Sequence, residues 1–212
     1  MAQIEVSKIR NVGIIGHGAA GKTTLCEALL FATGVTDRMG RVEDGNTVTD
    51  FEPEEISRQF SICTSLAFVE RNGIRVNLVD TPGYANFLED TRCAMSAVDG
   101  AVIVAPAIGG IKAETIKVWD FAAKYEVPSM VYISCLDKEN TDFREAVNTI
   151  CKAYGRSLTP IQLPIGSGES FSGVIDLVRM KAITGAGAKA VEGEIPADMQ
   201  EQTETAREVM IE

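Results

Sequence analysis

Hydrophobic residues along this chain alternate between short continuous runs and sets with helical spacing. Residues 10–16, RNVGIIG, form a short β-branched run that ends in glycine, a pattern typical of a buried strand. In residues 23–34, TTLCEALLFATG, the apolar positions follow the period of a helix, and Gly34 marks its end. The beginning of the chain therefore predicts a strand that leads directly into a helix.

The clearest hairpin signal lies in residues 60–80, where two β-rich runs flank Asn72-Gly73, the preferred pair for a type I′ turn. After the hairpin the patterns alternate, with helices over residues 85–98, 113–126 and 142–155 and strands over residues 100–107 and 129–136. Runs such as AVIVA and MVYIS suit parallel strands that helices cover on both faces. We predict an α/β fold whose doubly wound sheet is mainly parallel and has one antiparallel edge strand.

Residues 35–59 interrupt this alternation, because they are polar and have no periodicity. A loop of that length inside a domain is usually functional or mobile. Beyond Gly155 the signals become mixed: a strand over residues 158–166, strand and helix signals together over 172–185, a loop over 185–198 and a charged helix over 199–212. We assign residues 1–157 to the main domain and residues 158–212 to a further, smaller part.

Composition narrows the class of protein. Of the 212 residues, 45% are hydrophobic and 24% are charged, which is typical of a globular protein. No apolar run approaches the ~18–20 residues that span a membrane, and the N-terminus does not read as a signal peptide, so we expect a cytoplasmic protein without membrane contact. The net charge of −10 argues against general nucleic-acid binding. Five cysteines without a CxxC pair, together with the single histidine His17, predict reduced thiols rather than a zinc site.

Residues 16–23, GHGAAGKT, match the phosphate-binding pattern G-x-x-x-x-G-K-[ST] between a predicted strand and a predicted helix, which disfavours a mere glycine-rich turn. Backbone N–H groups of residues 18–23 can wrap a β-phosphate. Lys22 would bridge the β- and γ-phosphates, and the Thr23 hydroxyl would bind Mg²⁺. The residues expected at the nucleotide are His17, Gly18, Ala19, Ala20, Gly21, Lys22, Thr23 and Thr24. We interpret the His17 side chain as a packing or capping group rather than a catalytic one.

A second motif, VNLVDTPG, supplies an apolar strand that ends in Asp80 and continues to Gly83. A carboxylate there can hold Mg²⁺ through a water, and the Gly83 N–H can meet a γ-phosphate. A hydroxyl from the long loop should complete the metal site. The candidate is Ser61, with Thr64 as the second choice, and the alternative for Ser61 is a plain serine at the start of a strand.

These motifs, in this order and spacing, resemble the GTP-binding domain of bacterial elongation factor G and its ribosome-binding relatives. The resemblance covers essentially residues 10–212, and includes GHGAAGKTTLCEALL, GRVEDGNTVTDFEPEE, VNLVDTPGYANFLEDTRCAMSAVDGAVIVAPAIGGI, VPSMVYISCLDK and PIQLPIGSGESFSGVIDLVRMKAI. It implies a P-loop NTPase fold that binds and hydrolyses GTP, switches conformation with the nucleotide, uses GTP or GDP with Mg²⁺, and acts on the ribosome as a monomer.

The same resemblance implies that residues 158–212 are part of an α+β subdomain inserted in the GTPase fold, and that the chain ends within it. The family's later serine-alanine guanine loop would then be absent. The residues alone leave another interpretation open, in which LTPIQLPIGSG, residues 158–168, is itself the sixth strand and the guanine loop.

Four positions depart from the family's common pattern. Ala19 replaces the usual aspartate, Ser61 replaces a threonine, and SCLD, residues 134–137, replaces NKMD. Tyr84 replaces a histidine, as in paralogues that are similar to elongation factor G. Within SCLD, Asp137 keeps the carboxylate that can accept from guanine N1–H and its amino group, so Ser134, Cys135 and Asp137 are the expected base-binding residues.

Hydrolysis depends on Tyr84, since the residue after this glycine orients the attacking water. A tyrosine hydroxyl stays neutral at pH 7 and can still donate or accept one hydrogen bond, but its longer ring predicts slow intrinsic turnover. The expected catalytic residues are Tyr84, Lys22 and Gly83. Two alternatives stay open: a guanine-nucleotide-binding ribosome module with little hydrolysis, and a P-loop ATPase of the partitioning type. The second is disfavoured because His17 and Gly18 stand where that class has an additional lysine.

Overall fold

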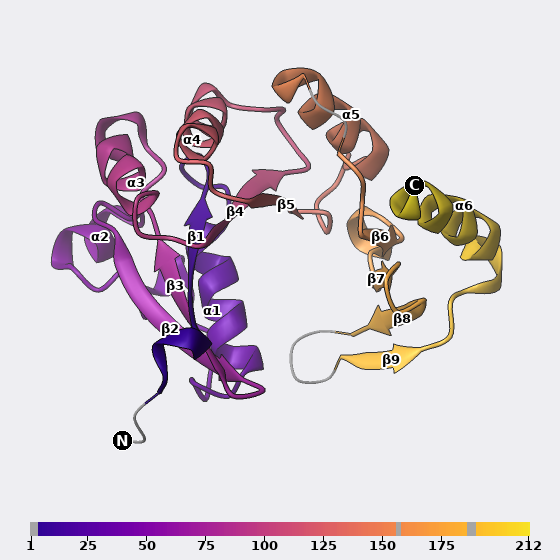
Figure 1. Cartoon of the computed structure of the whole chain (residues 1–212), viewed down its shortest axis with the longest axis horizontal. Helices are drawn as coiled ribbons and strands as arrows, with labels where there is room; N and C mark the ends of the chain where they lie inside the picture. The colour runs from indigo at the N-terminus through magenta and orange to yellow at the C-terminus, as the bar shows by residue number, and fades with distance from the viewer. Residues whose placement is uncertain (1–3, 156–157, 186–189) are drawn as a thin grey trace. The chain divides into compact units, whose positions relative to one another are not determined.

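A five-stranded sheet in the order β2-β3-β1-β4-β5 forms from the first two thirds of the chain (Figure 1). β1 pairs in parallel with β3 and β4, β4 pairs in parallel with β5, and only β2 is antiparallel to its neighbour within this sheet. Its strands are β1 (Ile9–Ile15), β2 (Ser65–Arg71), β3 (Ile74–Asp80), β4 (Gly100–Pro106) and β5 (Ser129–Ser134). The predicted mainly parallel sheet with one antiparallel edge strand is therefore confirmed.

This computed structural model describes residues 4–155, 158–185 and 190–212. They divide into two units. The first unit runs to Pro106 and includes Ile111–Ser134, and the second takes Ala107–Gly110 and Cys135–Glu212. The predicted domain boundary at residue 157 falls outside the described residues and stays a prediction.

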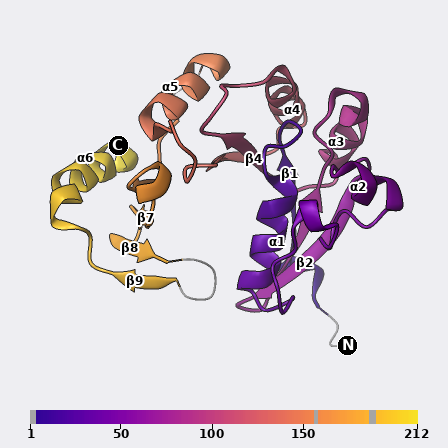
Figure 2. The same ribbon diagram turned by 180° about the vertical axis from the view of Figure 1, so that it is seen from behind.

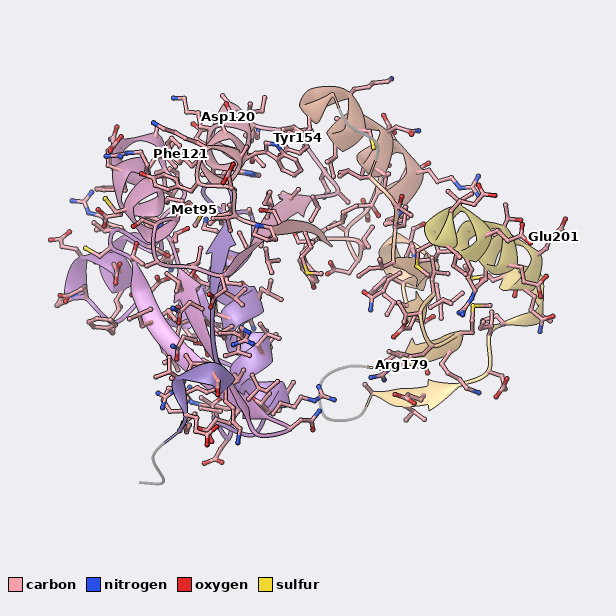
Figure 3. The ribbon with its side chains drawn as sticks, viewed as in Figure 1. Met95, Asp120, Phe121, Tyr154, Arg179 and Glu201 are labelled. Atoms are coloured by element: carbon pink, nitrogen blue, oxygen red, sulfur yellow. The ribbon has the colours of Figure 1, made fainter. Side chains whose placement is uncertain are left out.

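Helices cover both faces of the five-stranded sheet. Ile14 and Ile15 are neighbours in β1 and so point to opposite faces. Ile14 packs with Cys26 of α1, which lies along β1 in Figure 2, whereas Ile15 packs with Val118 of α4 and with Met95, labelled in Figure 3. The helices are α1 (Lys22–Ala32), α3 (Leu88–Ala94) and α4 (Ala113–Lys124), with 3-10 turns η1 (Val6–Lys8) and η3 (Ala85–Phe87). The buried runs that predicted parallel strands thus have helices on each side.

The hairpin between β2 and β3 has the predicted turn. Asn72 and Gly73 both adopt positive φ angles, 53° and 76°, as a type I′ turn requires. Arg71 pairs with Ile74 directly across the turn, and Ser65 pairs with Asp80 at the far end. This register brings Asp80 to the end of the sheet where the phosphate loop begins.

The long polar segment 35–59 is not structureless, and the prediction of a plain loop is wrong in part. It contains the 3-10 turn η2 (Val42–Asp44) and the helix α2 (Pro53–Arg58). Pro53 opens α2, Glu52 and Glu55 form a capping box, and Gln59 ends the helix in the left-handed conformation. A helix of six residues is too short to show a hydrophobic period, so only its capping residues could have revealed it.

The second unit contains a separate antiparallel sheet in the order β6-β7-β8-β9. Its elements are α5 (Phe143–Tyr154), β6 (Gln162–Ile165), η4 (Gly168–Ser170), β7 (Gly173–Asp176), β8 (Lys181–Thr184), β9 (Val191–Gly193), η6 (Ala197–Met199) and α6 (Gln200–Ile211). Buried Leu163, Ile175 and Leu177 form its core. Among the described residues, no helix has the length and apolar character needed to cross a membrane.

Two expectations for this unit need correction. β6 pairs only with β7 in this second sheet, so the interpretation of residues 158–168 as the sixth strand of the main sheet, with its guanine loop, is wrong. Leu163 faces Ile175 across this pair, and both are buried there. Within the predicted loop 185–198, β9 forms by pairing with β8, while residues 186–189 lie outside the described residues.

Candidate functional site

The phosphate loop between β1 and α1 needs glycine at two positions for backbone reasons. Gly16 and Gly21 have φ angles of 151° and 96°, which other residues rarely adopt. A Cβ on Gly16 would also lie 2.5 Å from the carbonyl oxygen of Val104. Inside the loop the buried Lys22 donates from Nζ to the carbonyl oxygen of His17 at 2.8 Å. The loop is therefore closed around its own lysine, directly before α1.

The His17 side chain points to α4 rather than to the phosphate-binding lysine. Its Nδ1 lies 2.9 Å from the hydroxyl oxygen of Thr115 in the first turn of that helix. Burial lowers the pKa of His17, and the charges of Lys22 and Lys112 lower it further, so the imidazole is neutral at pH 7. The contact supports the interpretation of His17 as a packing or capping residue.

Hydroxyls and a carboxylate from three segments meet beside Lys22. Thr23 and Thr49 both donate to the same oxygen of Asp80, Oδ2, at 2.9 and 2.8 Å. The Ser61 hydroxyl lies 3.2 Å from the Thr23 hydroxyl, and since the Thr23 proton goes to Asp80, Ser61 is the donor. The hydroxyl of Thr64 is buried without a hydrogen-bond partner among the described residues. Of the two candidate hydroxyls, Ser61 is the one that the fold brings to Thr23, which in turn donates to Asp80.

Asp50 is a member of this cluster that the sequence analysis missed. Its side chain is 4% exposed, and within the described part of the chain neither of its oxygens, nor Oδ1 of Asp80, has a hydrogen-bond partner. Buried polar atoms are normally paired, so these three oxygens are available as ligands for a cation. The loop's length pointed to function, but its spacing gave no reason to select Asp50 from the other acidic residues there.

Both carboxylates are held in an unfavourable environment for a negative charge. Burial raises the pKa of Asp80 to about 6, although Lys22 and the hydroxyls of Thr49 and Thr23 act in the opposite direction. Burial also raises the pKa of Asp50, and the nearby Ser61 hydroxyl offsets part of this rise. Lys22 is itself buried, and this lowers its pKa. The cluster therefore has more buried negative charge than Lys22 balances.

This donor set fits Mg²⁺. The ion prefers oxygen ligands, and proteins bind it with one or two carboxylates, hydroxyls, substrate phosphates and waters. Thr23 and Ser61 offer hydroxyl oxygens, and Asp80 and Asp50 offer unpaired carboxylate oxygens. In the described ranges, no group of three or more His, Cys, Asp or Glu side chains is arranged so that it could hold a metal ion by itself. The site consequently depends on hydroxyls and on the ligands that a nucleotide would bring.

Gly83 and Tyr84 form the next part of the site. A Cβ on Gly83 would overlap Lys22 Nζ and the backbone of Gly16 and His17, so Gly83 lies directly against the phosphate loop. Tyr84 is 43% exposed, and the centroid of its ring lies 4.7 Å from that of Phe60. A cavity of about 200 Å³ is lined by these residues, by the phosphate loop from Gly18 onward and by the segment that carries Asp50 and Ser61.

The segment that carries Thr49 and Asp50 is anchored to α1 by Glu27. Glu27 is 1% exposed, and its carboxylate accepts from the backbone N–H groups of Gly40 at 2.9 Å and Val48 at 2.6 Å. A Cβ on Gly40 would overlap that carboxylate. Glu27 therefore fixes both ends of residues 40–48 and sets where the next residues, Thr49 and Asp50, enter the site.

Replacing Glu27 by glutamine tests this anchor. An amide has one acceptor oxygen and one NH₂ donor, so one of the two backbone N–H groups loses its partner, at a cost of about 1–3 kcal/mol. We expect trypsin to cleave after Arg38 and Arg41 about 10-fold faster or more, because cleavage follows the population of the opened loop. Glu70→Gln, an exposed change on β2, is the matched control. Equal cleavage rates for the Glu27 variant and the native chain would contradict the anchor.

Of the predicted base-binding residues, the structure locates only Ser134 relative to the phosphate loop. The Ser134 hydroxyl, at the end of β5, donates to the carbonyl oxygen of Ala20 at 2.8 Å and so ties this strand to the phosphate loop. Cys135 has a φ angle of 61°, which turns the chain away from the strand direction. Cys135 and Asp137 belong to the second unit, so their contact with a base stays a prediction.

Comparisons with known proteins show the family to which this chain belongs. Residues 7–207 match the family model for the elongation factor Tu GTP binding domain. The chain is 39% identical over 212 residues to elongation factor G of Thermotoga petrophila, and 38% identical over 215 residues to that of Gluconobacter oxydans, with 99% and 100% of this chain covered. A crystal structure of a Thermus thermophilus protein covers 96% of this chain and 30% of its own, with a TM-score of 0.89 and 34% identity. The chain spans 30% and 31% of the length of these two elongation factors.

Proposed function

Because the chain belongs to the family of the elongation factor Tu GTP-binding domain, we propose that it is the GTP-binding and GTP-hydrolysing domain of a ribosome-associated protein similar to elongation factor G. The observation that carries this proposal is the cluster in which Thr23 and Thr49 share Asp80 beside Lys22. Thr49 and Asp80 come from segments outside the phosphate loop. Their positions can therefore respond to the presence of a γ-phosphate and its metal ion, as in other switch proteins.

The roles that we propose for the binding residues follow from their atoms. Backbone N–H groups of residues 18–23 hold the β-phosphate, and Lys22 binds β- and γ-phosphate oxygens. Thr23, Ser61, Asp80 and Asp50 hold Mg²⁺ directly or through water. The ion, when bound, neutralises phosphate charge during the reaction.

For hydrolysis, we propose that the Gly83 N–H meets the γ-phosphate and that Tyr84 orients the attacking water. The phenol oxygen can accept a hydrogen bond from water, but it is a poorer proton acceptor than an imidazole. Slow intrinsic turnover is expected for this reason. The packing of Tyr84 on Phe60 favours a second candidate, a guanine-nucleotide-binding module that hydrolyses little. GTPase assays of the protein that carries this domain, with and without ribosomes, separate the two.

The proposed partner is the ribosome, in the cytoplasm. It is the partner implied by the elongation factor G relatives, of which this chain covers 30–31%, and it would be met through the protein that carries this domain. We expect the domain to be monomeric. Its net charge of −10 disfavours general binding to nucleic acid.

Binding of labelled GDP, GTP and ATP in the presence of Mg²⁺ tests the proposed function, with Asp137→Asn as the key variant. Charged hydrogen bonds are worth about 1.5–3 kcal/mol each, so the native chain should prefer guanine over adenine nucleotides by about 10-fold or more. Asp137→Asn should remove most of this preference, while Asp198→Asn, an exposed change in the same unit, should keep it. Equal affinity of the native chain for ATP and GTP, or an unchanged preference in Asp137→Asn, would overturn the proposal.

A further inference from the structure

Gly18 is a glycine for a different reason from its neighbours in the phosphate loop. Gly16 and Gly21 have positive φ angles, whereas Gly18 does not, so its φ angle does not require glycine. A Cβ built on Gly18 would instead meet the ring of Tyr84, with Cε2 and Cζ at 2.7 Å and Cδ2 at 2.9 Å. Real Cβ atoms essentially never come closer than 3.0 Å to another heavy atom. The Tyr84 ring occupies the space that a side chain at position 18 would need.

The Tyr84 ring is also packed by an aromatic residue of the metal-binding segment. The ring centroid of Phe60 lies 4.7 Å from that of Tyr84, at an interplanar angle of 55°. The centroids of Phe60 and Phe87 lie 6.3 Å apart. Tilted pairs at such distances are favourable. Phe60 directly precedes Ser61, and Tyr84 directly follows Gly83. The ring therefore touches the phosphate loop and the Ser61 segment, and it belongs to a third segment itself.

We propose that Gly18, Tyr84 and Phe60 form a ring seat, in which the missing side chain of Gly18 admits Tyr84 to the phosphate loop and makes its position depend on the bound nucleotide. Because residue 18 has no side chain, position 84 can carry a ring as large as that of tyrosine. Phosphates that order the backbone of residue 18 fix the surface on which the Tyr84 ring lies. A ligand bound to Ser61 fixes the position of Phe60, the residue before it. This inference rests on the proposed function for its nucleotide-dependent part only.

A double-mutant cycle tests the fit of the seat without any nucleotide. Gly18→Ala keeps the backbone conformation and its N–H group but inserts the Cβ. We expect it to lower the thermal midpoint by about 3 °C in the native background and in Tyr84→Phe, which keeps the ring. In Tyr84→Ala, where the ring is gone, the same substitution should shift the midpoint by less than about 1 °C. An equal shift in all three backgrounds, or no shift in the native chain, would overturn the seat.

Fluorine NMR tests the coupling to the nucleotide. The chain has four tyrosines, so labelling with 3-fluorotyrosine gives few signals, and Tyr84→Phe identifies the one that belongs to Tyr84. Addition of Mg²⁺ and GDP should move the Tyr84 signal in the native chain and move it less in Gly18→Ala. If GDP binds and the signal does not move, the coupling is overturned while the proposed function survives. If GDP does not bind, the proposed function and the coupling fail together, and the thermal cycle still decides whether Gly18 admits the ring.

Discussion

Asp80→Asn is expected to change nucleotide binding and apo-protein stability in opposite directions. We expect the variant to bind GDP or GTP in the presence of Mg²⁺ about 10- to 100-fold more weakly, the usual loss when a group that supports a metal is removed. In EDTA at pH 7.5, the same variant should unfold at a higher temperature than the native chain. Loss of a residue with a merely structural role would lower both affinity and stability, so the combination is diagnostic.

The stabilisation follows from the cost of keeping the Asp80 carboxylate ionised. Its side chain is 1% exposed, and burial raises its pKa to about 6 from 3.8. A shift of this size corresponds to roughly 3 kcal/mol against the ionised form in the folded protein. Asparagine removes the charge, and its carbonyl oxygen can still accept from Thr23 and Thr49. Asp50 adds to the effect, since its negative charge also raises the Asp80 pKa.

The pH dependence has a definite sign. Between about 4 and 6 the folded state binds more protons at Asp80 than the unfolded state, so this group's contribution to stability falls as the pH rises through that window. The gain from Asp80→Asn should accordingly be small near pH 4, grow up to about pH 6 and stay constant above it.

Thermal melts in EDTA at several pH values measure this gain as the difference between the variant and the native chain. Asp120→Asn, an exposed change on α4 (Figure 3), is the control and should give no such difference. A gain that does not depend on pH, or a less stable variant at pH 7.5, would contradict the assignment of Asp80 as a buried charge.

The fold could be predicted from the sequence where the signals are local. The turn at Asn72-Gly73, the buried runs of the parallel strands and the glycine–lysine pattern of the phosphate loop each depend on a few neighbouring residues. The sheet to which β6 belongs could not be predicted in this way, because the pattern of a strand does not say which strand it will pair with. Its pairing with β7 follows from the core around Leu163.

The site was predictable to a similar degree. Lys22, Thr23 and Asp80 stand in recognisable patterns, and the fold brings them together. Asp50 does not, because it reaches the site through a segment whose course is fixed by Glu27, a residue of α1 distant in sequence. Gly18 was recognised as part of a phosphate loop, but its contact with Tyr84 depends on two segments meeting in space. Non-local contacts of this kind leave no spacing in a single sequence.

Lys22→Met is expected to weaken GTP binding more than GDP binding. Lys22 is 6% exposed, with its Nζ held on the His17 carbonyl oxygen, so it is placed before any nucleotide arrives. If it bridges the β- and γ-phosphates, GTP loses two charged hydrogen bonds and GDP loses one, at about 1.5–3 kcal/mol each. We therefore expect losses of about 100-fold or more for GTP and about 10-fold or more for GDP.

The same substitution should change the titration of its neighbour, which gives a readout that does not require a nucleotide. Lys22 lowers the pKa of Asp80, so its removal should raise that pKa above about 6. In melts in EDTA, the pH window in which the contribution of Asp80 to stability falls should then move to higher pH. Lys124→Met, an exposed change at the end of α4, should leave both the affinities and the window unchanged. Equal losses for GTP and GDP would place Lys22 on the β-phosphate alone, and an unchanged window would mean that Lys22 does not act on Asp80. The Asp80 variant lowers nucleotide affinity by removing a carboxylate that supports the metal ion, whereas the Lys22 variant lowers it by removing hydrogen bonds to the phosphates. The two variants together therefore separate metal binding from phosphate binding at one site.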